Sequence, residues 1–119
     1  MRHLLTAAVC AALATPAAAF TAQNGLVVRA DGSDAFDVAW TGPSGAPDFW
    51  CAAGDFAIRG LNLPTATRIF RYDAPRRKGG EGIRFGLDES RAQPTGLLRL
   101  QGGRGLTAAY ARRFCERSR

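Results

Sequence analysis

The stretch "DFWCAAGDFAIRGL", residues 48–61, constrains the fold more than any other part of the sequence. Its apolar side chains recur at helical spacing. The face that they share consists of Phe49, Ala53, Phe56 and Ala57. Pro47 and Asp48 suit a first helical turn, because proline loses no hydrogen bond there and the helix dipole favours a carboxylate. We therefore expect a helix over residues 48–60, which Asn62-Leu63-Pro64 ends.

The chain start is organised like a secretory signal peptide. Arg2 and His3 precede an apolar run over residues 4–14, a Thr-Pro break and three small residues that end at Ala19. We expect residues 1–19 to be removed, which leaves Phe20 as the first residue of a periplasmic or secreted chain. An apolar N-terminal helix of a cytosolic protein is the alternative.

Cys51, inside the opening stretch, is a candidate nucleophile, metal ligand or half of a disulfide. A nucleophile needs a base, and the only histidine, His3, lies in the expected signal peptide. Zinc takes several Cys or His ligands, which two distant cysteines do not supply. After residue 19 the second cysteine is Cys115. In an oxidising compartment this pair predicts one disulfide, which closes a loop of about 65 residues and contributes about 4 kcal/mol.

Two predicted hairpins flank the helix. The first covers residues 25–42 around the turn "DGSD", with alternating apolar residues in both strands. They are Leu26, Val28 and Ala30, then Phe36, Val38 and Trp40. The second joins residues 67–73 and 82–88 around a basic, glycine-rich tip. In its first strand Phe70 and Tyr72 are expected to face away from Ile69 and Arg71, and in its second Ile83, Phe85 and Leu87 are expected to point inward.

The C-terminal part is predicted to contain a second helix. Residues 97–101 are ambiguous between a short strand and a turn of helix. Residues 106–119 read as helix, with one apolar side made of Leu106, Ala109, Tyr110 and Phe114. The order β-β-α-β-β-(β)-α predicts one α+β domain over residues 20–119, a small antiparallel sheet of four or five strands with two helices and one disulfide.

The chain is basic, with a formal charge of +6, or +5 once Arg2 is removed with the signal peptide. Six side chains form a candidate anion-binding surface: Arg76, Arg77, Lys78, Arg112, Arg113 and Arg117. Such a surface suits an anionic lipid, an envelope polymer or an acidic protein. An arginine excess of genomic origin is the alternative. The sequence predicts no nucleic-acid partner, no metal, no cofactor and no transmembrane segment after signal cleavage.

Two further groups of residues allow other functions. The acidic pairs Asp48 with Asp55 and Asp88 with Glu89 are candidate catalytic carboxylates. Trp40, Trp50 and Tyr72 form either a sugar-stacking platform or part of the core. The leading hypothesis is a non-enzymatic binding module; the alternative is a carboxylate-dependent cell-envelope hydrolase, or an inhibitor of one.

The block "FWCAAGDFAIRGLNLPTATRIFRY", together with the C-terminal cysteine, resembles small uncharacterised exported proteins of alphaproteobacteria. The resemblance covers most of the chain after residue 19. It implies export and a paired-cysteine design, and it brings no activity, cofactor or site residue.

Overall fold

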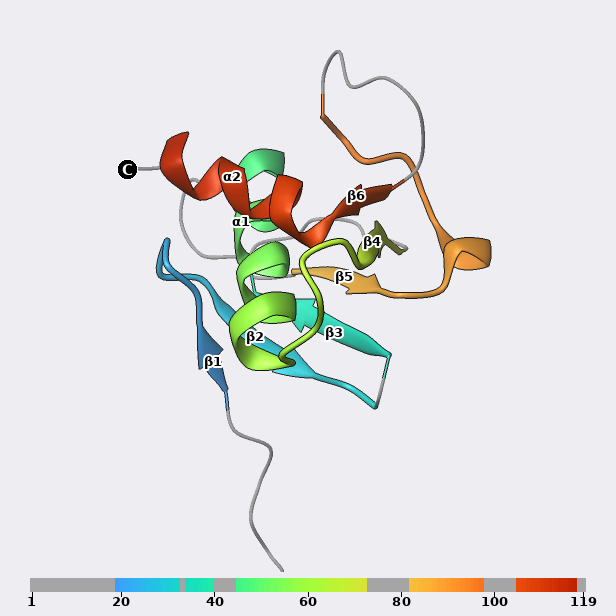
Figure 1. Cartoon of the computed structure of the whole chain (residues 1–119), viewed down its shortest axis with the longest axis horizontal. Coiled ribbons are helices and arrows are strands. Elements are labelled where there is room, and N and C mark those ends of the chain that lie inside the picture. The colour runs from blue at the N-terminus through green and yellow to red at the C-terminus, as the bar shows by residue number, and fades with distance from the viewer. Residues whose placement is uncertain (1–18, 33, 40–44, 73–81, 98–104, 118–119) are drawn as a thin grey trace, which may run out of the picture.

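The computed structural model describes residues 19–32, 34–39, 45–72, 82–97 and 105–117, the side chain of residue 117 excepted. A six-stranded antiparallel sheet carries two helices on one face (Figure 1). The sheet order is β1-β2-β3-β5-β4-β6. Its strands are β1 (Phe20–Thr21), β2 (Val27–Ala30), β3 (Ala35–Val38), β4 (Arg68–Arg71), β5 (Ile83–Gly86) and β6 (Gly105–Thr107). The helices are α1 (Ala46–Asp55) and α2 (Ala108–Arg117), with a π-helical turn η2 (Phe56–Gly60) and a 3-10 turn η3 (Glu89–Arg91).

The α+β fold and both hairpins agree with the sequence prediction. β2 pairs with β3 in the register Val28↔Val38, and β4 lies antiparallel to β5. The two hairpins join through β3 and β5, where Phe36 faces Phe85. Alternation places their apolar side chains on the face that the helices cover. Trp40 and the basic tip of the second hairpin lie outside the described residues.

The two edge strands differ from the prediction. β1 has only two residues and lies where no strand was expected. The optional strand predicted over residues 97–101 is not found at Leu97, and the rest of that segment lies outside the described residues. The strand beside β4 is instead β6, which occupies the first residues of the predicted C-terminal helix.

α1 is enclosed on all sides in its second half, because every residue from Phe49 to Ala57 is buried. It begins at Ala46, two residues before the predicted start. Gly54 lies where α2 crosses, and a Cβ there would stand 2.6 Å from the backbone nitrogen of Arg112. The glycine lowers helix propensity, but the close approach of the two backbones requires it.

α2 presents a different face to the core from the predicted one. Ala108, Ala111 and Cys115 are buried, whereas Ala109 and Tyr110 are exposed. The prediction counted Leu106 as helical, but this residue belongs to β6. The helix therefore starts later. Of the predicted apolar side chains, Leu106 and Phe114 contact the core, whereas Ala109 and Tyr110 do not.

The outer face of the sheet has a small core of its own, made of Ala35, Phe70, Tyr72 and Ala92. Phe70 lies over Gly105 and the Tyr72 ring over Gly86, since a Cβ on either glycine would overlap the ring. Phe70 and Tyr72 thus face away from Ile69, as predicted, because Ile69 belongs to the core under the helices. Trp50 and Tyr72 are each 1% exposed, so they are core residues and not a sugar-stacking platform.

Candidate functional site

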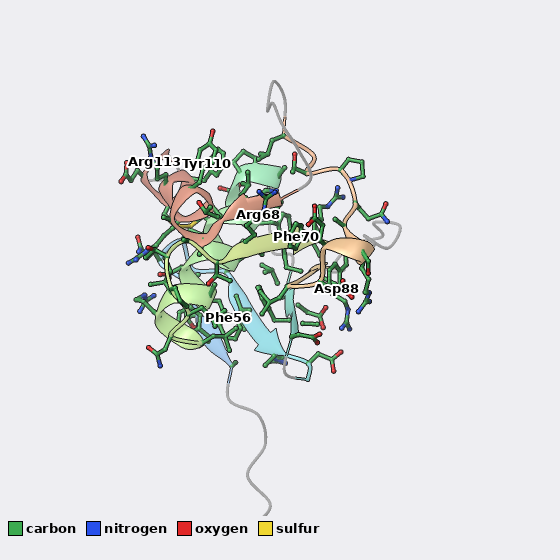
Figure 2. All side chains as sticks on the ribbon, turned by 45° about the vertical axis from the view of Figure 1, so that its right-hand side comes forward. Phe56, Arg68, Phe70, Asp88, Tyr110 and Arg113 are labelled. Atoms are coloured by element: carbon green, nitrogen blue, oxygen red, sulfur yellow. A yellow bond between two sulfur atoms is a disulfide. The ribbon has the colours of Figure 1, made fainter. Side chains whose placement is uncertain are left out.

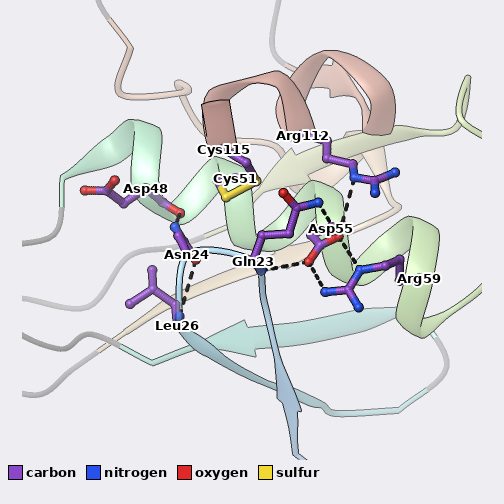
Figure 3. The surroundings of a disulfide bond; sticks show 9 residues. All are labelled: Gln23, Asn24, Leu26, Asp48, Cys51, Asp55, Arg59, Arg112 and Cys115. Carbon is purple, nitrogen blue, oxygen red and sulfur yellow. Dashed lines mark hydrogen bonds and ion pairs between the residues drawn. A yellow bond between two sulfur atoms is a disulfide. The ribbon is translucent and has the colours of Figure 1, made fainter. Parts of the chain in front are cut away.

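The two helices are joined by the predicted disulfide between Cys51 and Cys115, with an S–S distance of 2.06 Å and a Cα–Cα distance of 4.8 Å. Both residues are buried. The bond crosses from α1 to α2 beneath the outer surface of the helices (Figure 3). Neither sulfur is therefore available as a nucleophile or as a metal ligand.

Next to the disulfide, the Asp55 carboxylate is completely buried and links three segments (Figure 3). It accepts hydrogen bonds from Arg59 Nε at 2.8 Å and from the backbone N–H of Gln23 at 2.9 Å. Arg112 Nε of α2 lies 3.5 Å from its Oδ1. Gln23 follows β1 and Arg59 lies in η2, so one carboxylate fastens the segment after β1, the π-helical turn and α2 together.

The environment of Asp55 keeps it ionised. Burial raises the pKa of Asp55, but the hydrogen bonds from Arg59 and Gln23 and the charges of Arg59 and Arg112 outweigh burial and lower the pKa below its usual value. The buried charge faces two guanidinium groups, so the cluster retains an excess positive charge. That charge lies toward the surface, because about a third of the Arg112 side chain and nearly half of the Arg59 side chain are exposed.

Arg112 and Arg113 line a hollow of about 310 Å³ along one side of α2, where the helix borders η2. We call this hollow the arginine hollow. Its other lining residues are Gln23, Ile58, Thr65, Ala109 and Glu116. Of the six predicted anion-binding side chains, the structure thus brings Arg112 and Arg113 together. Arg76, Arg77, Lys78 and the side chain of Arg117 lie outside the described residues.

Charges balance over the described side chains. The acidic ones are Asp31, Asp34, Asp37, Asp48, Asp55, Asp88, Glu89 and Glu116. The basic ones are Arg29, Arg59, Arg68, Arg71, Arg84, Arg91, Arg112 and Arg113. On the outer sheet face Arg84 contacts both Asp31, at 2.7 Å, and Asp37, at 3.2 Å. The described part of the chain therefore has a local positive site at α2 and no overall excess of positive charge.

Two of the candidate catalytic carboxylates, Asp48 and Asp88, accept hydrogen bonds from nearby backbone N–H groups. Asp48 caps α1 by accepting a hydrogen bond from the Gly45 N–H at 2.9 Å. Asp88 accepts from the N–H and the hydroxyl of Ser90, and these bonds lower the pKa of Asp88. A general acid at neutral pH needs a raised pKa, and Asp55 and Asp88 are both shifted the other way.

A second hollow, of about 290 Å³, adjoins the arginine hollow along α2. Tyr110, Arg113, Phe114 and Glu116 line it, and we call it the aromatic hollow. Figure 2 shows Tyr110 and Arg113 together on the outer side of this helix. Tyr110 was predicted on the apolar side of the C-terminal helix, but its side chain is exposed. The signal for the true helix start is Thr107, whose hydroxyl caps the helix by accepting a hydrogen bond from the Tyr110 N–H at 3.1 Å.

Within the described residues, no three or more His, Cys, Asp or Glu side chains gather in a way that could hold a metal ion. The same residues include no helix with the length and apolar character needed to cross a membrane. No protein-family model matches the chain, and no curated protein and no solved structure is significantly similar to it.

Proposed function

We propose that this protein is an exported, non-enzymatic binding module that meets an anionic partner in the cell envelope through helix α2. The observation that carries the proposal is the pair Arg112 and Arg113 at the arginine hollow, with Arg112 held by the buried Asp55. The resemblance to exported alphaproteobacterial proteins agrees with this location.

Pre-organisation makes this pair better suited to binding than isolated surface arginines. An arginine loses side-chain entropy when it binds a ligand, and a guanidinium that is already held loses less. The Asp55 carboxylate holds the Nε edge of Arg112, while about a third of the side chain stays accessible. Arg113 follows it on the exposed side of α2 and adds a second positive charge.

The disulfide supports the exported location. Such bonds persist mainly in oxidising compartments, and this one joins the two cysteines that remain after residue 19. The predicted signal peptide would direct the chain to the periplasm or beyond it. Among the described residues, the first strand begins at Phe20, the same residue that the predicted cleavage would leave at the start of the chain.

Binding to anionic surfaces tests the proposal. The exported protein, residues 20–119, purified without reductant, is mixed with phosphatidylglycerol vesicles, polyglutamate and oligogalacturonate at increasing salt. We expect it to bind at least one of these polyanions, and the binding to weaken at least about tenfold as added salt shortens the Debye length from about 10 Å to about 3 Å. Neutral phosphatidylcholine vesicles are expected not to bind.

Two matched variants assign the binding to α2. Arg113→Gln should weaken it, whereas Arg29→Gln should not, because Arg29 is an exposed arginine on the outer face of β2. Both positions are exposed, so either substitution should change stability by at most about 0.5 kcal/mol. Binding to none of the three polyanions, or binding that is indifferent to salt and to Arg113→Gln, would refute the proposal.

A further inference from the structure

We infer that the anionic partner is an acidic glycan, a chain of sugar rings that carry carboxylates, bound along the outer side of α2. This inference rests on the proposed function and adds the chemical class of the ligand. One sugar ring stacks on Tyr110 in the aromatic hollow, and a carboxylate of the glycan binds Arg113 between the two hollows.

The aromatic hollow supplies the apolar half of such a site. Among the described residues Tyr110 is the exposed large hydrophobic side chain, with 43% of its surface accessible. Its ring stacks on that of Phe114 with the centroids 5.9 Å apart and the planes 18° from parallel. Phe114 packs against the main core, so its contact with the Tyr110 ring restrains that ring.

An exposed ring beside an arginine matches the surface of a sugar acid. The C–H bonds on one face of a pyranose carry a slight positive charge, and the face of an aromatic ring is slightly negative. The carboxylate projects from the ring edge, where a planar guanidinium can bind both of its oxygens. Arg113 lines both hollows, so it lies within reach of a ligand in either one.

The acidic residue in the site favours a glycan over a dense polyanion. Glu116 also lines both hollows, and it repels closely spaced phosphates or carboxylates. A carboxylate side chain is, however, a strong acceptor for hydroxyl groups, which a sugar ring carries in number. Gln23 and Thr65 in the arginine hollow add polar side chains that can also form hydrogen bonds with sugar hydroxyl groups.

The size of the hollows agrees with small repeating units. Ligand pockets measure about 300–1,000 Å³. Volumes of about 310 Å³ and 290 Å³ lie at or just below the lower end of that range. Each hollow is therefore of a size for a small ligand group, and the two hollows, which share Arg113 and Glu116, suit a ligand made of small repeating units.

The experiment compares oligogalacturonate with polyglutamate of equal carboxylate number, by calorimetry on the exported protein, residues 20–119, at moderate salt. Both polymers are flexible polycarboxylates, and only the first has sugar rings. We expect the wild type to prefer oligogalacturonate about tenfold, which corresponds to about 1.4 kcal/mol. Tyr110→Ala should abolish this preference, whereas Tyr110→Phe, which keeps the ring, should retain it. Arg113→Gln should weaken the binding of both polymers.

The outcomes separate this inference from the proposed function. Equal affinity of the wild type for the two polymers, with the binding still dependent on salt and on Arg113, would overturn the glycan and leave anion binding intact. Loss of the preference in Tyr110→Phe would also overturn ring stacking. Binding of neither polymer would refute the glycan, and the anionic vesicles would then show whether the proposed function survives. Far-ultraviolet circular dichroism of each variant checks that the exposed substitutions leave the fold unchanged.

Discussion

The two helices of this protein have almost the same length and opposite characters. α1 is buried from Phe49 to its end, between the sheet and α2. α2 buries only the stripe of Ala108, Ala111 and Cys115, and it turns Tyr110 and Arg113 outward. The first helix organises the core, and the second is fastened on its inner side and leaves its outer side exposed.

The contacts that stabilise α2 and the residues proposed to bind a partner lie on different sides of this helix. The contacts that fasten α2 lie on its inner side and include the disulfide, the Gly54 crossing and the Asp55 cluster. The residues proposed to bind lie on its outer side. Changes on the inner side should therefore alter stability strongly, and changes on the outer side should alter binding alone.

Removal of the disulfide should have the largest effect. In the double variant Cys51→Ala with Cys115→Ala, the unfolded chain has a higher conformational entropy, because the disulfide no longer closes a loop. We expect a loss of about 4 kcal/mol in the free energy of unfolding. Urea titration measures it, and wild-type protein denatured and refolded with a reductant should show a similar loss. An unchanged urea midpoint would mean that packing alone fastens α2.

Asp55→Asn should cause the second largest loss in the free energy of unfolding. The substitution leaves Arg59 and Arg112 without their buried counter-charge, and breaking a buried ion pair in this way costs about 3 kcal/mol. Asp31→Asn is the matched control, because it removes an ion pair of Arg84 at an exposed position and should cost less than about 1 kcal/mol. Equal losses in the two variants would contradict a special role for the buried carboxylate.

The same carboxylate should make the stability of the wild type depend on acid. The pKa of Asp55 is lower in the folded protein than in the unfolded chain, where it is about 3.9. Its contribution is therefore complete above that pH and is lost as the pH falls through the folded value. Urea midpoints between pH 6 and about pH 2 should fall more steeply in the wild type than in Asp55→Asn.

Gly54→Ala should have a smaller effect, about 2 kcal/mol, because the new methyl group meets the backbone of α2 and forces the helices apart. The direction is informative, since alanine favours a helix by about 1 kcal/mol over glycine. Ala109→Gly, at an exposed position of α2, is the comparison and should cost about 1 kcal/mol through propensity alone. The measurement is thermal denaturation. A higher melting temperature of Gly54→Ala than of the wild type would show that the two helices leave space for a methyl group where they cross.

Tyr72→Phe should have the smallest effect on stability among these changes. On the outer face of the sheet the Tyr72 hydroxyl accepts a hydrogen bond from the Asp88 N–H at 2.8 Å. Its loss should cost about 1 kcal/mol. Tyr110→Phe, which removes an exposed hydroxyl, is the control and should leave the melting temperature unchanged. A similar shift in both variants would indicate an effect of the substitution type and not of the hydrogen bond.

The elements with strong local patterns were predictable from the sequence. Strict alternation through Val28 and Val38 gave the first hairpin, and helical spacing from Phe49 to Ala57 gave α1. The disulfide followed because the other uses of Cys51 need partners that the chain lacks. Each of these inferences depends either on a periodic pattern or on the number of residues of one type, and both are read directly from the sequence.

The remaining features depend on contacts between distant residues. β1 and β6 are too short to show a period, so Leu106 was assigned to the helix that follows it, and Tyr110 was placed on the wrong side as a result. Nothing local distinguishes the buried Asp55 from a surface acid except Arg59, four residues later, which is the spacing of a helical ion pair. Arg112 joins that pair only through the tertiary fold.

The position of the cysteine bridge also determines how the chain would respond to mechanical tension. A force that pulls on the chain before Cys51 and after Cys115 is carried covalently by the disulfide, so the intervening segment, which includes β4, β5 and β6, cannot be extended. Of the described chain, only the residues before Cys51 and the few after Cys115 can be drawn out. Residues 20–51 correspond to about 110 Å of extended chain. If such a protein were anchored at one end and attached to a polymer at the other, tension would thus extend it by a short, fixed length only. The part of the chain inside the disulfide loop would not be extended.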